Sequence, residues 1–461
     1  MQFRHIFQTF TNSSNNPLVY SIGLNFFPIS FFEISTESIV MARHTKIFLG
    51  LLIGAVAGVL CNNFLPGTPF LFAVQKYLSD PLGKIFLNML IMMVVPLVFA
   101  SLALGVTQMG DLKQLGRIGM RTFSYFLLVT TLAVMIGLVL VNTIRPGDYL
   151  SDEIKTEMMT TYSEQAAELK SAAGKNEFGI QTLVNFVPRN PIAAIARPNP
   201  DMLALIFVTM MVGIALTLID KERAQPVIRL LEGINDITVK IIDIAMKLAP
   251  YGVAALIFSV TSRFGFDLLI ALSMYVVTVL LGLTLHQFGA FAVLIRVFVK
   301  YNPVQFFKKI RTVMLTAIST SSSNATLPTT ILVSQKNLGI PSKITGFVLP
   351  LGATMNMNGT AIFEGVTVLF LAQVFGVDLS LGMQTIVVIM SLLISVGSAG
   401  VPSGSIPLLV MVLGMVNVPA EGIAIILGVD RILEMCRTVV NVTGDITCAA
   451  YVARKEGAEL T

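Results

Sequence analysis

Long apolar stretches recur along the chain, and eight of them are long enough, or nearly so, to cross a lipid bilayer once. They lie near residues 46–62, 86–109, 117–143, 203–219, 237–262, 267–298, 344–372 and 420–452. A helix needs about 20 apolar residues to span the hydrocarbon core. Charged residues make up only 12% of the sequence and the mean hydropathy is +0.80, whereas a soluble domain has about 25% charged residues. We therefore expect an all-α polytopic membrane protein with eight transmembrane helices.

Two further apolar stretches do not fit single crossings. Residues 303–338 carry a mostly polar run, Thr316 to Asn324, between apolar turns, which is typical of a hairpin tip. Residues 379–416 have no charge but are interrupted from Gly397 to Ser405 by glycine, serine and proline, which break helices. Irregular backbone within a membrane is tolerated only where protein or a water-filled cavity satisfies its polar groups. Two re-entrant hairpins around a midplane binding site are therefore predicted, with ordinary loops between short helices as the alternative.

The loops predict the orientation in the membrane. Basic residues gather near 113–121, 221–229, 296–311 and 454–455, so both termini are expected in the cytoplasm and the polar loop 144–199 outside. Residues 1–40 lack the order of a secretory signal. We expect them to be a disordered extension or a mis-assigned start, with translation beginning at Met41, and we expect 456–461 to be a short tail.

Charge and cysteine usage exclude several other classes. The net charge of +5 comes from 31 basic and 26 acidic residues, which loop lysines and arginines explain better than a nucleic-acid-binding face. The spacing of the three cysteines and three histidines predicts neither a disulfide framework nor a zinc site. An intramembrane enzyme built on the serine-rich tip would lack a general base. We expect no enzyme activity and no cofactor.

The last apolar stretch carries polar groups on one helical face. Successive steps of four, three, four and four residues separate Asp430, Glu434, Arg437, Asn441 and Asp445, so these side chains stack along one side of a helix. A charge in hydrocarbon costs several kcal/mol, so the stripe indicates a partner, a cavity or an ion. The alternative is an amphipathic helix at the cytoplasmic surface.

A second polar pattern lies in the stretch before the second hairpin. Polar residues alternate at Thr354, Asn356, Asn358 and Thr360, and alternation is not a helical period. It predicts a locally unwound helix whose oxygens face a hard cation such as sodium. The alternative is that these side chains form hydrogen bonds between helices.

These motifs occur together in a known family. Ser321-Ser322-Ser323 with Thr326-Leu327-Pro328, Asn356-Met357-Asn358-Gly359-Thr360, Ala399-Gly400-Val401-Pro402 and the segment Arg437 to Asp445 follow in this order. Residues 41–455 thus resemble the dicarboxylate/amino acid:cation symporters, the glutamate transporter family. The resemblance implies a homotrimer with an elevator movement. Its scaffold would take the first two of the three helices in 41–143 and the two helices in 200–262, and its transport domain would take the third helix and residues 263–455.

The resemblance also implies roles for individual residues. Arg437 would bind the side-chain carboxylate of the substrate through its planar guanidinium, and Glu434, where the family usually has aspartate, would pair with the substrate ammonium. The implied substrate-binding residues are Ser321, Ser323, Thr360, Val401, Glu434, Arg437, Thr438 and Asn441. One implied sodium site consists of Gly352, Asn356, Asn441 and Asp445, and a second of Thr354, Ser395, Val396 and Ser398.

The resemblance implies a third cation site, but this sequence lacks most of the residues that would bind the cation there. Asn358 replaces the motif aspartate, and Phe126 and Val129 replace the usual ligands, which leaves Thr130. We therefore expect a symporter of the inner (cytoplasmic) membrane that imports glutamate, aspartate or a C4-dicarboxylate. About two sodium ions would be coupled, with a proton carried by Glu434 or another carboxylate. The alternatives are a substrate-gated anion channel and a neutral amino acid symporter of the same fold.

Overall fold

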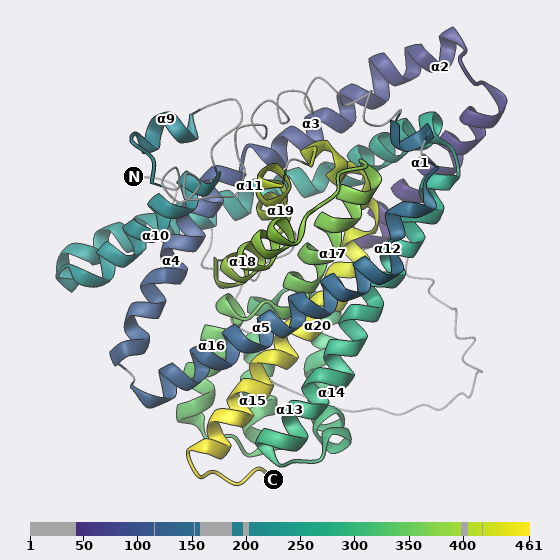
Figure 1. Ribbon diagram of the computed structural model, residues 1–461. Coiled ribbons are helices and arrows are strands. Elements are labelled where there is room, and N and C mark those ends of the chain that lie inside the picture. The colour runs from purple at the N-terminus through teal and green to yellow at the C-terminus, as the bar shows by residue number, and fades with distance from the viewer. Residues whose placement is uncertain are drawn as a thin grey trace, which may run out of the picture. The chain divides into compact units, whose positions relative to one another are not determined.

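The computed structural model describes residues 43–114, 116–151, 153–156, 187–196, 202–397, 404–416 and 418–461 (Figure 1). Every regular element within these ranges is a helix, which confirms the predicted class. The predictions for residues 1–40, for most of the loop 144–199, and for Ser398 and Val401 fall outside the described residues.

The first half of the described chain forms helices that overlap the predicted crossings, but the predicted crossing 86–109 is divided between α3 and α4. They are α1 (Arg43–Phe64), α2 (Pro69–Val74), α3 (Asp80–Ile91), α4 (Val94–Gln114), α5 (Arg117–Ile144), α9 (Pro191–Ile195), α10 (Met202–Leu218) and α11 (Lys221–Phe264). Helix α11 begins well before the expected residue 237 and continues through Pro226 and Pro250. Its extra turns carry Lys221 and Arg223, whose charges had indicated a loop.

The second half contains the segments that are predicted to form the two hairpins and the last two crossings. Its helices are α12 (Asp267–Thr284), α13 (Phe291–Leu294), α14 (Pro303–Thr320), α15 (Ser323–Leu338), α16 (Ser342–Met355), α17 (Asn358–Val374), α18 (Leu381–Gly397), α19 (Ile406–Met415) and α20 (Ile423–Lys455). Within the described residues, six helical segments are long and apolar enough to span a membrane, and residues 204–218, 381–396 and 406–415 form shorter apolar helices.

Helix α1 packs closely along α11 through three glycines. A Cβ atom on Gly50 or Gly54 would collide with a backbone carbonyl of α11, and one on Gly58 would collide with the side chain of Thr261. Glycines four residues apart lie on one face of a helix and let two backbones approach. Helix α11 also contacts α3 and α4, and α4 contacts α10. These helices form one packed group.

Helix α20 is the centre of a second packed group. It contacts α12, α14, α15, α16 and α17, and α5 in turn packs against α17 (Figure 1, α20 in yellow). The two groups meet where α20 contacts α1 and α11, and where α18 and α19 contact α4. Because most of α20 is buried, its polar stripe faces protein rather than lipid, which argues against a helix lying on the membrane surface.

The first hairpin turns where the polar run predicts it. Helix α14 ends at Thr320, and Ser321 adopts a left-handed backbone conformation with φ of 50°. The side chain of Ser322 then accepts a hydrogen bond from the backbone N–H of Ala325 and caps α15. The tip of the second hairpin, residues 398–403, lies outside the described residues.

The predicted unwinding also occurs. Helix α16 ends at Met355 and α17 begins at Asn358. Between them Asn356 has φ and ψ of −122° and 74°, and Met357 has −102° and 55°. The break exposes backbone groups inside the protein, next to α20.

Candidate functional site

Buried charges on α20 form the first part of the site. The Arg437 side chain is only 2% exposed, and its Nη2 donates to Asp430 Oδ1 at 2.8 Å. The same nitrogen lies 3.8 Å from Glu434 Oε1. The guanidinium carbon lies 3.8 Å from the ring centre of Phe363 on α17, a favourable cation–π arrangement. Arg437 is thus held in one orientation by an ion pair and an aromatic ring.

The guanidinium of Arg437 keeps unused hydrogen-bonding capacity. Its Nε and Nη1 have no hydrogen-bond partner among the described residues, although both atoms are buried. A buried donor without a partner costs free energy, about 1–3 kcal/mol and more for a charged group. An incoming carboxylate would recover that energy, so this arginine is suited to bind an anion.

The other predicted substrate-binding residues that the structure describes lie on α17, on α20 and at the tip between α14 and α15. Thr360 Oγ1 accepts from Asn441 Nδ2 at 3.3 Å, so α17 and α20 bring these two side chains together. Ser321 and Ser323 are buried at the tip between α14 and α15, a hairpin whose two helices both contact α20. Thr438 instead donates its hydroxyl to the Glu434 carbonyl of its own helix at 2.8 Å.

Asp445 is the centre of the first predicted sodium site. Asn356 Nδ2 donates to Asp445 Oδ1 at 2.8 Å, and the Gly359 N–H donates to Asn441 Oδ1 at 2.7 Å. Asn356 Oδ1 is buried without a partner among the described residues. A Cβ atom on Gly352 would collide with the Asp445 carboxylate, so a glycine is required there. The four predicted residues are therefore neighbours, and they offer oxygens to a hard cation.

The second predicted sodium site is described only in part. Ser395 Oγ accepts from the backbone N–H of Met357 at 2.9 Å, which joins α18 to the unwound segment. A Cβ atom on Gly105 of α4 would come within 2.7 Å of the Val396 carbonyl oxygen. Thr354 donates to the Leu351 carbonyl at 3.0 Å. The end of α18 thus meets the helix break.

Two residues of the third cation site, which is predicted to have lost its function, form a hydrogen bond with each other. Thr130 Oγ1 donates to Asn358 Oδ1 at 2.7 Å, and Asn358 Nδ2 is buried without a partner among the described residues. Phe126 and Val129 are each 3% exposed and belong to the hydrophobic core. The amide therefore presents its N–H groups, which repel a cation, rather than a second oxygen.

Two features of the site were missed by the sequence reasoning. Glu364 on α17 is completely buried, and neither of its carboxylate oxygens has a partner among the described residues. A single acid within the apolar run AIFEGVTVLF was the signal that could have found it. Arg431 donates from Nη1 to Glu434 Oε2, and a step of three residues on a helix could have predicted that pair.

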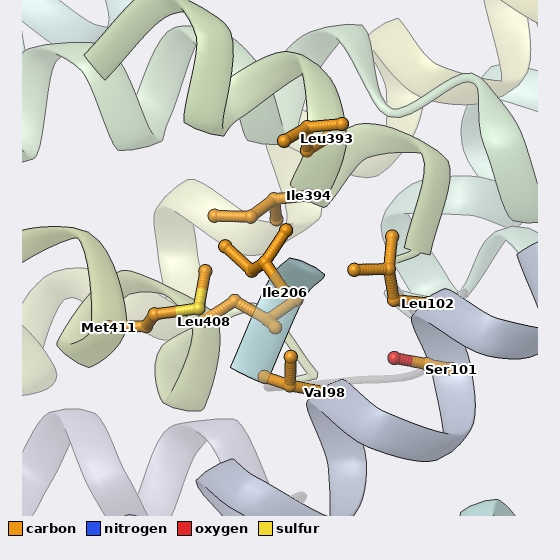
Figure 2. A pocket seen from close by; sticks show the side chains of 8 residues that line it. All are labelled: Val98, Ser101, Leu102, Ile206, Leu393, Ile394, Leu408 and Met411. Atoms are coloured by element: carbon orange, nitrogen blue, oxygen red, sulfur yellow. The ribbon is translucent and has the colours of Figure 1, made fainter. Parts of the chain in front are cut away.

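A separate apolar pocket lies between the two packed groups. Figure 2 shows it between α4, α10, α18 and α19, lined by Val98, Ser101, Leu102, Ile206, Leu393, Ile394, Leu408 and Met411. Ser101, the one polar residue in the part of the lining that the structure describes, donates to the Leu97 carbonyl at 2.7 Å. The pocket offers nothing to an anionic ligand, so it is not the site described above.

A membrane-spanning helical chain with buried charges beside a broken helix belongs to the class of membrane transport proteins. Comparison with known proteins agrees, because residues 44–455 match the model of the sodium:dicarboxylate symporter family. The chain belongs to this family.

Curated relatives match over nearly their whole length. A proton/sodium-glutamate symport protein of Bacillus subtilis is 36% identical over 90% of this chain and 92% of its own length. A proton/glutamate-aspartate symporter of Escherichia coli is 33% identical over 88% of this chain and 92% of its own. A C4-dicarboxylate transport protein of Bacillus subtilis is 32% identical over 89% of this chain and 93% of its own.

Proposed function

We propose that the protein is a secondary active symporter that imports an acidic amino acid, glutamate or aspartate, or a C4-dicarboxylate, together with sodium ions and protons. The observation that carries this proposal is Arg437, whose buried guanidinium has Nε and Nη1 atoms without a partner among the described residues, beside the polar face of α20. The names of the relatives, which include glutamate, glutamate-aspartate and C4-dicarboxylate transporters, support the same substrate classes.

Arg437 would bind a carboxylate of the substrate. The remaining polar contacts would come from Thr360, Asn441, the serines of the first hairpin tip, and Val401 and Thr438. Glu434 would meet the ammonium group of an amino acid. Since most of these groups are buried, the bound substrate would be withdrawn from water, which strengthens each charged contact.

Two sodium ions would be coupled to each substrate. Asp445 supplies a countercharge for the first, with oxygens from Asn356, Asn441 and Gly352, and the unpartnered Asn356 Oδ1 supports this role. Thr354, Ser395, Val396 and Ser398 would bind the second. A third sodium is not expected, because the Asn358 amide lacks the charge that a buried cation needs. Three sodium ions per substrate would contradict this assignment.

Glu364 would carry the proton. Its carboxylate is buried and has no hydrogen-bond partner among the described residues, and an ionised carboxylate without a partner is unfavourable there. Glu364→Gln should therefore abolish the acceleration of uptake by an inward proton gradient while uptake driven by sodium persists. Asp378→Asn, which changes an exposed acid, is the matched control. An unchanged proton effect in Glu364→Gln would contradict the role.

The two packed groups support an elevator mechanism. The group around α11 would be the scaffold of a homotrimer, and the group around α20, with both hairpins and α5, would be the transport domain that carries the substrate across. The protein would have eight transmembrane helices, reside in the inner (cytoplasmic) membrane and have both termini in the cytoplasm. Cross-linking in native membranes tests the trimer, and a monomer would contradict it.

Uptake into proteoliposomes tests the function as a whole. Labelled glutamate, aspartate, succinate and a neutral amino acid are supplied under sodium and proton gradients that are set independently. Concentrative uptake of an acidic substrate only with a cation gradient supports the proposal. Anion currents without such uptake would favour a substrate-gated channel, and uptake of neutral amino acids alone would favour a neutral amino acid symporter.

A further inference from the structure

The Glu434 carboxylate lies between two arginines on α20. Arg431 Nη1 donates to Oε2 of Glu434, and Arg437 Nη2 lies 3.8 Å from Oε1. The side chains of Arg431 and Glu434 are only 15% and 7% exposed. Together with the pair between Arg437 and Asp430, the charges form a continuous chain of alternating sign.

This arrangement changes what Glu434 requires of a substrate. An acidic amino acid brings an ammonium group that can neutralise a carboxylate, whereas a C4-dicarboxylate brings only negative charge. A buried carboxylate that loses its counterion costs several kcal/mol. With a dicarboxylate bound to Arg437, Glu434 would face two further carboxylates, and Arg431 is the cation that remains next to it.

We propose that Arg431 is a specificity-determining residue whose guanidinium takes the place of a substrate ammonium at Glu434. It allows the site to accept a C4-dicarboxylate, and it lowers the affinity for acidic amino acids, whose ammonium group must compete with it. This inference rests on the proposed function and deepens it, because it names the residue that sets the balance between the two substrate classes.

The geometry around Arg431 supports such an exchange. The ion pair joins residues three positions apart on a single helix, so it can open without moving any helix. Arg431 Nε has no partner among the described residues, so one carboxylate is the main anchor of the guanidinium. Arg437, by contrast, is fixed by both Asp430 and Phe363. Arg431 is therefore the more easily displaced of the two arginines.

Equilibrium binding of labelled aspartate and succinate to the purified full-length protein in sodium tests the inference. Arg431→Gln should bind aspartate about tenfold more tightly and succinate about tenfold more weakly, each tenfold step corresponding to about 1.4 kcal/mol. Arg431→Met, which keeps an unbranched apolar stem, is a second neutral variant with the same expected result. Arg431→Lys, which keeps the cation, should restore the ratio of the two dissociation constants to within about threefold of the original protein.

Arg454→Gln is the matched control, because it removes an exposed arginine from the same helix. Thermal unfolding of each variant verifies that it is folded. A purely structural role for Arg431 would weaken both ligands alike, so an unchanged ratio of the dissociation constants in the folded neutral variants overturns the inference. If the original protein binds neither ligand in sodium, the proposed function itself fails, which is a distinct result.

Discussion

Replacing Arg437 with cysteine should remove the recognition of acidic substrates. The change deletes the guanidinium that is 2% exposed and lies against Phe363, and it leaves a small neutral side chain. A substrate carboxylate would then enter the site without a cationic partner. We expect uptake of glutamate, aspartate and succinate to be lost and uptake of small neutral amino acids to appear.

The size of the effect follows from the burial of the pair. Truncating one partner of a buried, hydrogen-bonded ion pair costs about 2–5 kcal/mol, which corresponds to a loss of affinity of about 30- to 4,000-fold. Asp430 Oδ1 accepts a hydrogen bond from Arg437 Nη2 at 2.8 Å. The same change leaves this buried carboxylate without its cation, so the folded protein should also lose stability. The double variant Arg437→Cys/Asp430→Asn removes the stranded charge and should recover part of that stability without recovering acidic uptake.

The assay combines uptake in proteoliposomes with thermal unfolding in detergent. The double variant separates the two effects, since it is expected to unfold at a higher temperature than Arg437→Cys while remaining inactive toward acidic substrates. Uptake of glutamate, aspartate and succinate by Arg437→Cys within threefold of the original protein would refute the assignment of Arg437.

Three further changes test other contacts. Gly352→Ala places a methyl group against the Asp445 carboxylate, 2.7 Å from its Cγ, and should weaken sodium binding about tenfold. The Cβ atom of Gly346→Ala, on the same helix, would meet no described atom within 4 Å, so this control should leave sodium binding unchanged. Sodium-dependent uptake measures both variants. Glu434→Gln should weaken aspartate binding much more than succinate binding, and equal losses would contradict its role at the ammonium group. Gly54→Val should destabilise the protein by about 1–3 kcal/mol through overpacking against α11, and an unchanged unfolding temperature would show that this contact is loose.

Local patterns predicted the parts of the site that depend on one helix or one turn. The steps between Asp430 and Asp445 determine a helical face regardless of the surrounding fold, and α20 presents that face to buried protein. The alternation around Asn356 likewise predicted the break between α16 and α17, because polar residues at every second position cannot share one side of a helix.

Contacts between distant segments were harder to predict. The sequence did not indicate that Phe363 would lie under Arg437 or that Ser395 would accept from the backbone of Met357, because each contact joins segments brought together only by the fold. The start of α11 was misplaced because a helix that leaves the membrane carries charges like those of a loop. The division into scaffold and transport domains, the trimer and the roles of individual residues stay predictions.

The chain of alternating charges on α20 also determines how a membrane voltage acts on transport. Asp430, Arg431, Glu434 and Arg437 cancel one another in formal charge, so they would contribute no net charge to the movement of the proposed transport domain. Under the proposed coupling to two sodium ions, and before any proton is counted, a dicarboxylate dianion would cross without net charge, whereas an amino acid anion would bring in one positive charge. For each net positive charge that enters with the amino acid, an inside-negative potential would add about 2.3 kcal/mol per 100 mV to its accumulation. Under the same coupling, the potential would act on dicarboxylate accumulation only through the protons that enter with it.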